Sequence, residues 1–160
     1  METSTGPIKR HEAIVQFSRE HHFGLLLIWK IRQGLKKGIE LKRIADYVLF
    51  FFDEDLKDHF AEEERLLFTK LEDTDVLKLQ ALKEHEEINS LIDGFRINDA
   101  DTGQLNIFAD TLDSHIRFEE RVLFNHLQKK LSDEELLILA KEHPEKKVDA
   151  DAKWNDHFWL

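Results

Sequence analysis

The chain carries proline only near its two ends, at Pro7 and Pro144. Proline interrupts an α-helix more strongly than any other residue, because it lacks a backbone N–H and clashes with the preceding turn. No position between these two therefore forbids a long helix. The interior is also rich in leucine, lysine, glutamate and alanine, which favour helix over strand. The sequence thus predicts an all-α fold.

Apolar residues recur at helical spacing in four long segments, each of which keeps one apolar stripe along its length. We expect helices over about residues 11–37, 41–71, 75–95 and 102–130. The connections are short, so neighbouring helices should run antiparallel and form an up-down-up-down four-helix bundle. Ser132 is followed by three acidic residues, which is the pattern of a helix cap and predicts a short fifth helix to about Lys141.

The length of 160 residues corresponds to a single domain, with a bundle over about 11–130 and a C-terminal extension over 131–160. The extension ends in a short aromatic tail that contains Trp154, Phe158 and Trp159. We expect these aromatic side chains to pack either onto the bundle or onto a second subunit. The second arrangement would make the protein a homodimer through its tail.

Composition excludes several classes of function. The chain has no cysteine, so disulfides, thiolate zinc sites, iron–sulfur clusters and cysteine nucleophiles are ruled out. Acidic residues outnumber basic ones, 33 to 23, which argues against nucleic acid as a partner. The apolar run Leu49–Phe52 is too short to cross a membrane, and the first residues lack the apolar core of a signal peptide. We therefore expect a cytoplasmic protein without a membrane partner.

Two ten-residue segments are close copies of each other. HFAEEERLLF begins at His59 and HIRFEERVLF begins at His115, and six of the ten positions are identical. A looser likeness joins SREHHFGLLL, around His21, to LKEHEEINSL, around His85. The chain therefore consists of two helix pairs of one plan, in which a Glu-His helix is followed by a His-x-x-x-Glu helix.

The four-residue spacing within each copy has a geometric consequence. Residues i and i+4 of a helix lie on one face, about 6 Å apart along the axis, so His59 aligns with Glu63. The same spacing aligns His115 with Glu119. Facing helices of a bundle can bring such pairs to one point, which is how dinuclear carboxylate sites are built. Each carboxylate can bridge two cations, and imidazole with carboxylate oxygen suits iron, manganese or zinc.

The charge of these side chains also argues for metal. The four histidines and two glutamates lie on stripes that are otherwise valine, phenylalanine, leucine and isoleucine. A carboxylate buried there without a partner would cost several kcal/mol. Two divalent cations would supply the missing positive charge and leave room for a small ligand. One His-x-x-x-Glu pair is common on solvated helix faces, but two copies in register, each with a preceding core-facing histidine, predict a metal site.

The order of these motifs resembles the hemerythrin-like, or HHE cation-binding, family over about residues 11–130. In that family the helices carry, in order, His, His-x-x-x-Glu, His and His-x-x-x-Glu. The resemblance implies a non-haem di-iron site with histidines as terminal ligands and two glutamates as bridges. The terminal ligands that it implies include His59 and His85, the bridges are Glu63 and Glu119, and His115 completes the pair on the fourth helix.

Two histidines compete for the position on the first helix. His21 follows Glu20, as the family's motif does, and lies on the same face as Ile14 and Ile28. His22 has Leu25 three residues later, which also fits the motif. We favour His21 and keep His22 as the alternative.

The chain departs from the oxygen-carrying hemerythrins at two positions. Those proteins have a second histidine where this chain has Asn89, and their fourth helix has a longer His-to-Asp spacing where this chain has His115-x-x-x-Glu119. Four histidines instead of five leave both metals an open position. The resemblance therefore implies a site that binds or reacts with O₂, NO or peroxide in sensing, scavenging or iron handling, instead of reversible oxygen carriage.

If the protein is an enzyme, we expect a di-iron oxidoreductase of a small inorganic molecule, because no phosphate loop, nucleophile–base pair or cofactor motif is present. The alternative is a helical regulatory module that metal orders and that binds a partner without catalysis.

Residues around the predicted ligands carry weaker expectations. Asp55 lies one turn before His59 and is either a partner for its second ring nitrogen or an exposed acid. Glu62, Glu64 and Glu120 flank the ligands and are expected to be solvated or to form ion pairs on the surface. His11, His143 and His157 are expected to have no role at the site, and His126 is expected at the end of the bundle.

Overall fold

The computed structural model describes residues 10–143 and 150–160, and within these ranges all regular secondary structure is helical. Pro7, Pro144 and the part of the predicted extension from 144 to 149 lie outside the described residues. The α-helices are α1 (Glu12–Lys36), α2 (Leu41–Phe51), α3 (Lys57–Glu62), α4 (Val76–Ile97), α5 (Thr102–Phe118), α6 (Phe124–Lys130) and α7 (Asp133–Glu142). The predicted all-α fold is confirmed.

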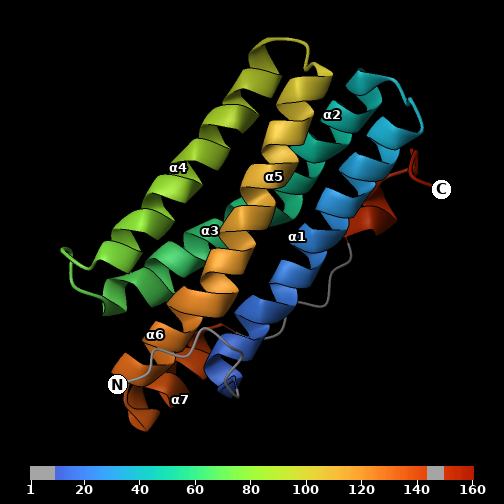
Figure 1. The fold of residues 1–160 in the computed structure, drawn as a ribbon. Coiled ribbons are helices and arrows are strands. Elements are labelled where there is room, and N and C mark those ends of the chain that lie inside the picture. Colours follow the sequence, from blue (N-terminus) through green and yellow to red (C-terminus); the bar gives the residue numbers. More distant parts are fainter. Residues whose placement is uncertain (1–9, 144–149) are drawn as a thin grey trace.

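Four long helical rods lie side by side (Figure 1). Two of them are α1 and α4. The other two are composite, because π-helical turns join α2 to α3 and α5 to α6. Phe52–Leu56 joins α2 to α3, and Glu119–Leu123 joins α5 to α6. A third π-helical turn, Glu63–Leu67, follows α3, and a 3₁₀ turn, Phe68–Lys70, ends the α2–α3 rod. The rod boundaries match the four predicted helices to within about two residues, the usual uncertainty of a helix end. The up-down-up-down order of directions stays a prediction.

Local side-chain chemistry sets where the helices begin. The carboxylate of Asp75 accepts a hydrogen bond from the backbone N–H of Leu77 at 2.9 Å and so caps α4. Asp101 forms a reciprocal capping box at the start of α5. Ser132 forms another with Glu135 at the start of α7, which confirms the predicted fifth helix. These caps satisfy backbone donors that the first turn of a helix leaves free.

The apolar core has two parts. One is built around the buried Tyr47, Phe108 and Leu112, and the other lies around Phe17 and Phe124. α1 packs against α2, α5 and α7, and α4 packs against α2 and α5. Along each rod, the predicted histidines and glutamates lie between residues of the first part and residues of the second. The site therefore occupies a polar layer within an apolar interior.

The aromatic tail packs onto the bundle of its own chain. Phe158 and Trp159 are buried and join the core around Tyr47, with ring centroids 5.8 and 4.9 Å from the Tyr47 ring. Trp154 stacks on Phe50 at 4.6 Å. Of the two arrangements expected for the tail, the structure thus shows contact with the bundle. A homodimer through the tail stays a prediction.

None of the helices within the described part of the chain has the length and apolar character that crossing a membrane requires.

Candidate metal centre

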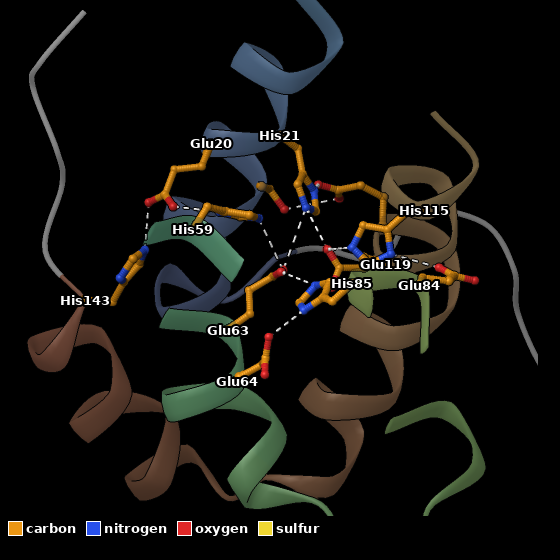
Figure 2. A network of polar contacts seen from close by, with 12 residues as sticks. Glu20, His21, His59, Glu63, Glu64, Glu84, His85, His115, Glu119 and His143 are labelled. Carbon is orange, nitrogen blue, oxygen red and sulfur yellow. Dashed lines mark hydrogen bonds and ion pairs between the residues drawn. The ribbon is translucent and has the colours of Figure 1, made fainter. Parts of the chain in front are cut away.

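Six donor side chains from four helical rods point toward one another in the middle of the bundle (Figure 2). All six are buried, with no more than 5% of any residue exposed. They come from α1, α3, α4, α5 and the first residues of two π-helical turns. We call them the inner donors: His21, His59, Glu63, His85, His115 and Glu119.

The structure separates the two candidates on α1. His21 is 4% exposed and belongs to the inner donors, whereas His22 lies on the solvent face of the same helix. Consecutive helix residues are turned by 100° relative to each other, so only one of them can face the interior. His22 is therefore not among the residues that the fold brings together.

The inner donors form two groups that share both glutamates. One group contains His21 and His59, the other contains His85 and His115, and Glu63 and Glu119 belong to both. Within each group the donor atoms lie within 4.8 Å of one another.

The oxygens of Glu63 reach in two directions. Oε1 lies 3.2 Å from His85 Nε2, and Oε2 lies 3.3 Å from His59 Nε2. Oε1 of Glu119 lies 2.9 Å from His21 Nε2 and 3.2 Å from His115 Nε2. Each carboxylate therefore lies between a histidine of one group and a histidine of the other.

Among the residues that the structure describes, most of the atoms that face this centre have no hydrogen-bond partner. They are Nε2 of His59, His85 and His115, both carboxylate oxygens of Glu63, and Oε2 of Glu119. Buried polar atoms are almost always hydrogen-bonded in folded proteins, because an unsatisfied one costs about 1–3 kcal/mol. Six such atoms around one point are what a cation-binding site requires, since a bound cation would take these lone pairs.

Within residues 10–143 and 150–160, no lysine or arginine forms an ion pair with the two inner carboxylates. The ion-pair partners that the structure gives Glu63 and Glu119 are all inner histidines. A lysine or arginine at this place would have neutralised the carboxylates and left no need for a cation. The charge pattern therefore fits cation binding.

Each inner histidine is hydrogen-bonded to a glutamate through the ring nitrogen that faces away from the centre. The Nδ1 atoms of His21, His59, His85 and His115 lie 2.7–2.9 Å from a carboxylate oxygen. The four partners, which we call the outer carboxylates, are respectively Glu120, Glu20, Glu64 and Glu84 (Figure 2). A carboxylate accepts hydrogen bonds, so Nδ1–H of each ring donates and Nε2 is directed toward the centre.

This arrangement corrects two expectations from the sequence. Glu64 and Glu120 are not merely solvated acids, because each holds the ring of an inner histidine. The partner of His59 is Glu20, on the neighbouring helix α1, and not Asp55. Glu62 does form the expected surface ion pair, with Arg65 at 2.7 Å.

The outer carboxylates could have been found from the repeat. In both halves a glutamate directly precedes the first histidine, as in Glu20-His21, and another directly follows the inner glutamate, as in Glu63-Glu64. Sequence spacing does not show that Glu20 is hydrogen-bonded to His59 instead of to its own neighbour in the sequence, His21. That crossed pairing comes from the packing of α1 against the α2–α3 rod.

Aromatic rings line both sides of the centre. Phe124 stacks on His21 with centroids 5.3 Å apart, and Phe68 stacks on His85 at 5.4 Å. These two phenylalanines occupy the last positions of the two repeated segments. Phe60 stacks still closer on His85, at 4.0 Å. The rings limit the access of water and make the local dielectric low, which strengthens electrostatic interactions among the inner donors.

The inner donors perturb each other's pKa values strongly. Burial alone would lower the pKa of His115, but Glu119 and the hydrogen bond to Glu84 outweigh it and raise the pKa to about 10. The pKa values of His21, His59 and His85 are also raised, because facing carboxylates overcome the effect of burial. Burial would raise the pKa of Glu119, but His115 and His21 hold it well below its ordinary value. The inner histidines and Glu119 therefore each favour the charged form of the other.

Two further residues lie outside the inner donors. Asn89, one turn after His85, is exposed and lines a surface groove together with Glu64. His126 bonds Asp75 at 2.8 Å near the start of α4, consistent with the expected position at a bundle end. Neither residue belongs to either group of inner donors.

This geometry defines a buried cation-binding site of the histidine–carboxylate class within a helical bundle. The family model described as hemerythrin HHE cation binding domain matches residues 12–127, which is well over half of the chain. The chain therefore belongs to the hemerythrin HHE cation-binding family. Neither the curated proteins nor the solved structures gave a match. The matched range contains all the inner donors and outer carboxylates.

Proposed function

We propose that the chain holds two iron ions and that this pair binds or reacts with a small ligand, O₂, NO or peroxide. The observation that carries the proposal is that the two groups of donors share both glutamates. Two carboxylates between two histidine pairs are suited to hold two cations close together, with each carboxylate in reach of both. A single cation would leave one histidine pair without a role.

The ligand assignment follows from the two groups. His21 and His59 would bind one cation through Nε2, and His85 and His115 would bind the other. Glu63 and Glu119 would bridge them. Imidazole with carboxylate oxygen suits iron and is also accepted by manganese and zinc. We favour iron because the arrangement agrees with the di-iron pattern that the sequence resembles.

A pair of iron ions, when bound, supplies one-electron redox steps and coordination positions that a small molecule can occupy. The protein contributes two histidines and two shared glutamates to each ion, which is fewer than the six donors of an octahedral site. Solvent or a small ligand would therefore complete the coordination. This is the property that a sensor, a scavenger or an iron-handling protein requires.

The protein's own side chains prepare the site. The outer carboxylates hold the Nδ1–H groups, so that the Nε2 lone pairs are directed inward and the rings become better ligands. The stacked phenylalanine rings exclude water from the centre. Phe60 and Glu64 both contact His85 and also line the surface groove with Asn89. We assign this groove as the approach for a small ligand.

The biological role that we propose is the sensing, scavenging or handling of iron or of a small inorganic ligand in the cytoplasm. If turnover occurs, the protein would be an oxidoreductase of such a molecule.

Metal analysis of protein purified from cells tests the proposal most directly. We expect two irons per chain, and a near-ultraviolet absorption band that develops when protein reduced under nitrogen is exposed to air. Protein with His59 and His115 both changed to alanine serves as the control and should contain no stoichiometric iron. Wild-type protein that contains no metal, or contains zinc and shows no response to air, would contradict the proposal.

A further inference from the structure

The last α-helix, α7, ends beside the candidate metal centre, although no sequence motif connects the two. His143, directly after α7, places Nε2 2.7 Å from Oε2 of Glu20. The other oxygen of Glu20 lies 2.7 Å from Nδ1 of His59. His143 was expected to be unrelated to the site, but Figure 2 shows it joined to His59 through Glu20.

Packing fixes the position of the His143 ring. The ring stacks on Phe17 with centroids 3.9 Å apart and an interplanar angle of 10°. Phe17 is fully buried and makes an edge contact with His59 at 6.2 Å. Leu136 and Leu139 of α7 are buried in the same apolar cluster as Phe17. Helix α7 is thereby docked on α1, and the residue that follows it, His143, is held against Glu20.

The corresponding glutamate of the other half has no such partner. Glu84 repeats the contacts of Glu20: one oxygen pairs with His115 at 2.8 Å, and the other accepts from Gln80 Nε2 at 2.9 Å. Glu20 likewise accepts from Gln16 Nε2 at 3.1 Å, and Gln16 precedes Glu20 by the same four residues. Within residues 10–143 and 150–160, only Glu20 of these two also contacts a histidine outside the inner donors.

The two halves also differ in exposure. The Glu20 side chain is 8% exposed, whereas that of Glu84 is 19% exposed. The second outer carboxylate of each half shows the same trend. Glu120, behind His21, is 30% exposed and also accepts from Ser18 Oγ at 3.1 Å, whereas Glu64, behind His85, is 44% exposed. The surroundings of His21 and His59 are therefore more enclosed and more firmly hydrogen-bonded.

We infer that His143 is a positioning residue which acts through Glu20 to hold His59, so that the cation bound by His21 and His59 is released more slowly than the cation bound by His85 and His115. The inference rests on the proposed two-cation site. Glu20 can rotate away from His59 only by breaking its bond to a ring that is itself packed on Phe17. Glu84 can move after losing one amide contact.

The test measures release of Fe²⁺ from anaerobically loaded protein into an excess of a chelator that becomes coloured when it binds Fe²⁺. Wild-type protein should release its two irons in two phases of equal amplitude. His143→Ala should accelerate the slow phase roughly 10-fold, the lower end of the effect of removing a partner behind a metal ligand. The fast phase should keep its wild-type rate.

Matched variants separate positioning from general loosening of the fold. Gln80→Ala removes the amide contact to Glu84, the outer carboxylate behind His115, and should accelerate only the fast phase. His143→Gln keeps a side-chain donor for Glu20 and should bring the slow phase back toward the wild-type rate. Far-ultraviolet circular dichroism of each variant checks that the helices are intact before loading.

Three results would overturn the inference: a single release phase in wild-type protein, an unchanged slow phase in His143→Ala, or acceleration of the same phase by His143→Ala and Gln80→Ala. Failure of wild-type protein to take up two Fe²⁺ would instead contradict the proposed function. The number of irons loaded and the rates of release therefore distinguish the two failures.

Discussion

Replacing Glu63 with alanine tests the reasoning about the centre most severely, because this side chain belongs to both groups of donors. Glu63 is fully buried, and its two oxygens lie 3.2 and 3.3 Å from His85 and His59. In the proposed two-cation site, loss of its carboxylate therefore removes a donor from each cation at once. A residue that served only one cation would spare the other.

The size of the effect can be worked from this geometry. Removing even a partner behind a metal ligand lowers affinity 10–100-fold, so we take about 100-fold as the smallest loss at each cation. A 100-fold weaker affinity lowers the stabilisation by a saturating ligand by about 2.7 kcal/mol. Two cations give about 5 kcal/mol. For a chain of this size, 1 kcal/mol corresponds to about 2–4 °C in Tm, so the iron-loaded variant should melt at least about 10 °C below iron-loaded wild type.

The assay is thermal unfolding of iron-loaded and iron-free protein, with iron counted in each sample. Glu87→Ala is the matched control, since Glu87 lies on the exposed face of α4 two residues after His85. It should keep two irons per chain and the wild-type Tm. Glu63→Ala protein that also keeps two irons and the wild-type Tm would refute the reasoning. Loss of helix in iron-free Glu63→Ala would instead favour a site whose role is to order the bundle.

Further predictions concern charge and packing. Facing carboxylates raise the pKa values of the four inner histidines, and histidine binds a cation as the neutral imidazole. Binding of Fe²⁺ should therefore release protons, measurable with a pH indicator, and no release would contradict this. The pKa of His115 is raised from 6.5 to about 10. The stability that this side chain contributes to iron-free protein is therefore complete below pH 6.5 and is lost as the pH rises toward 10. The Tm of iron-free protein should fall over this interval, and a Tm that rises would contradict the prediction. Gly34→Ala should destabilise the chain by about 1–3 kcal/mol in urea unfolding, because the added Cβ would lie 2.8 Å from Phe158 and 2.9 Å from Ile44. Gly94→Ala, where the new Cβ meets nothing within 4 Å, should instead stabilise it by about 0.4–1 kcal/mol.

Much of the fold was predictable because helix formation depends on local chemistry. The proline-free interior, the apolar stripes and the cap at Ser132 lie within a few residues of the backbone that they direct. The predicted helix ends differ from the observed ones by about two residues. The π-helical turns at Glu63 and Glu119 were not predicted, because their extra residue per turn leaves no distinct mark in the pattern of apolar side chains.

The inner donors were predictable for a related reason. Four-residue spacing places His59 with Glu63 on one side of a helix whatever lies around it, and the copy at His115 and Glu119 repeats the constraint. Because the His-x-x-x-Glu pair occurs twice in two similar segments, it is implausible that these residues share a face by chance. The sequence by itself therefore determined which residue types share a face and that two such faces occur.

Only the tertiary structure decided how those faces meet. Spacing sets the angle of a side chain around its own helix, but the rotation and axial shift of one helix against its neighbour depend on packing between them. That packing turned His21 inward and His22 outward, and it paired His59 with Glu20 from another helix. It also brought His143 to the same glutamate across 123 positions of sequence. Contacts of this range leave no periodic signal, so the partners behind the donors had to be seen in the folded chain.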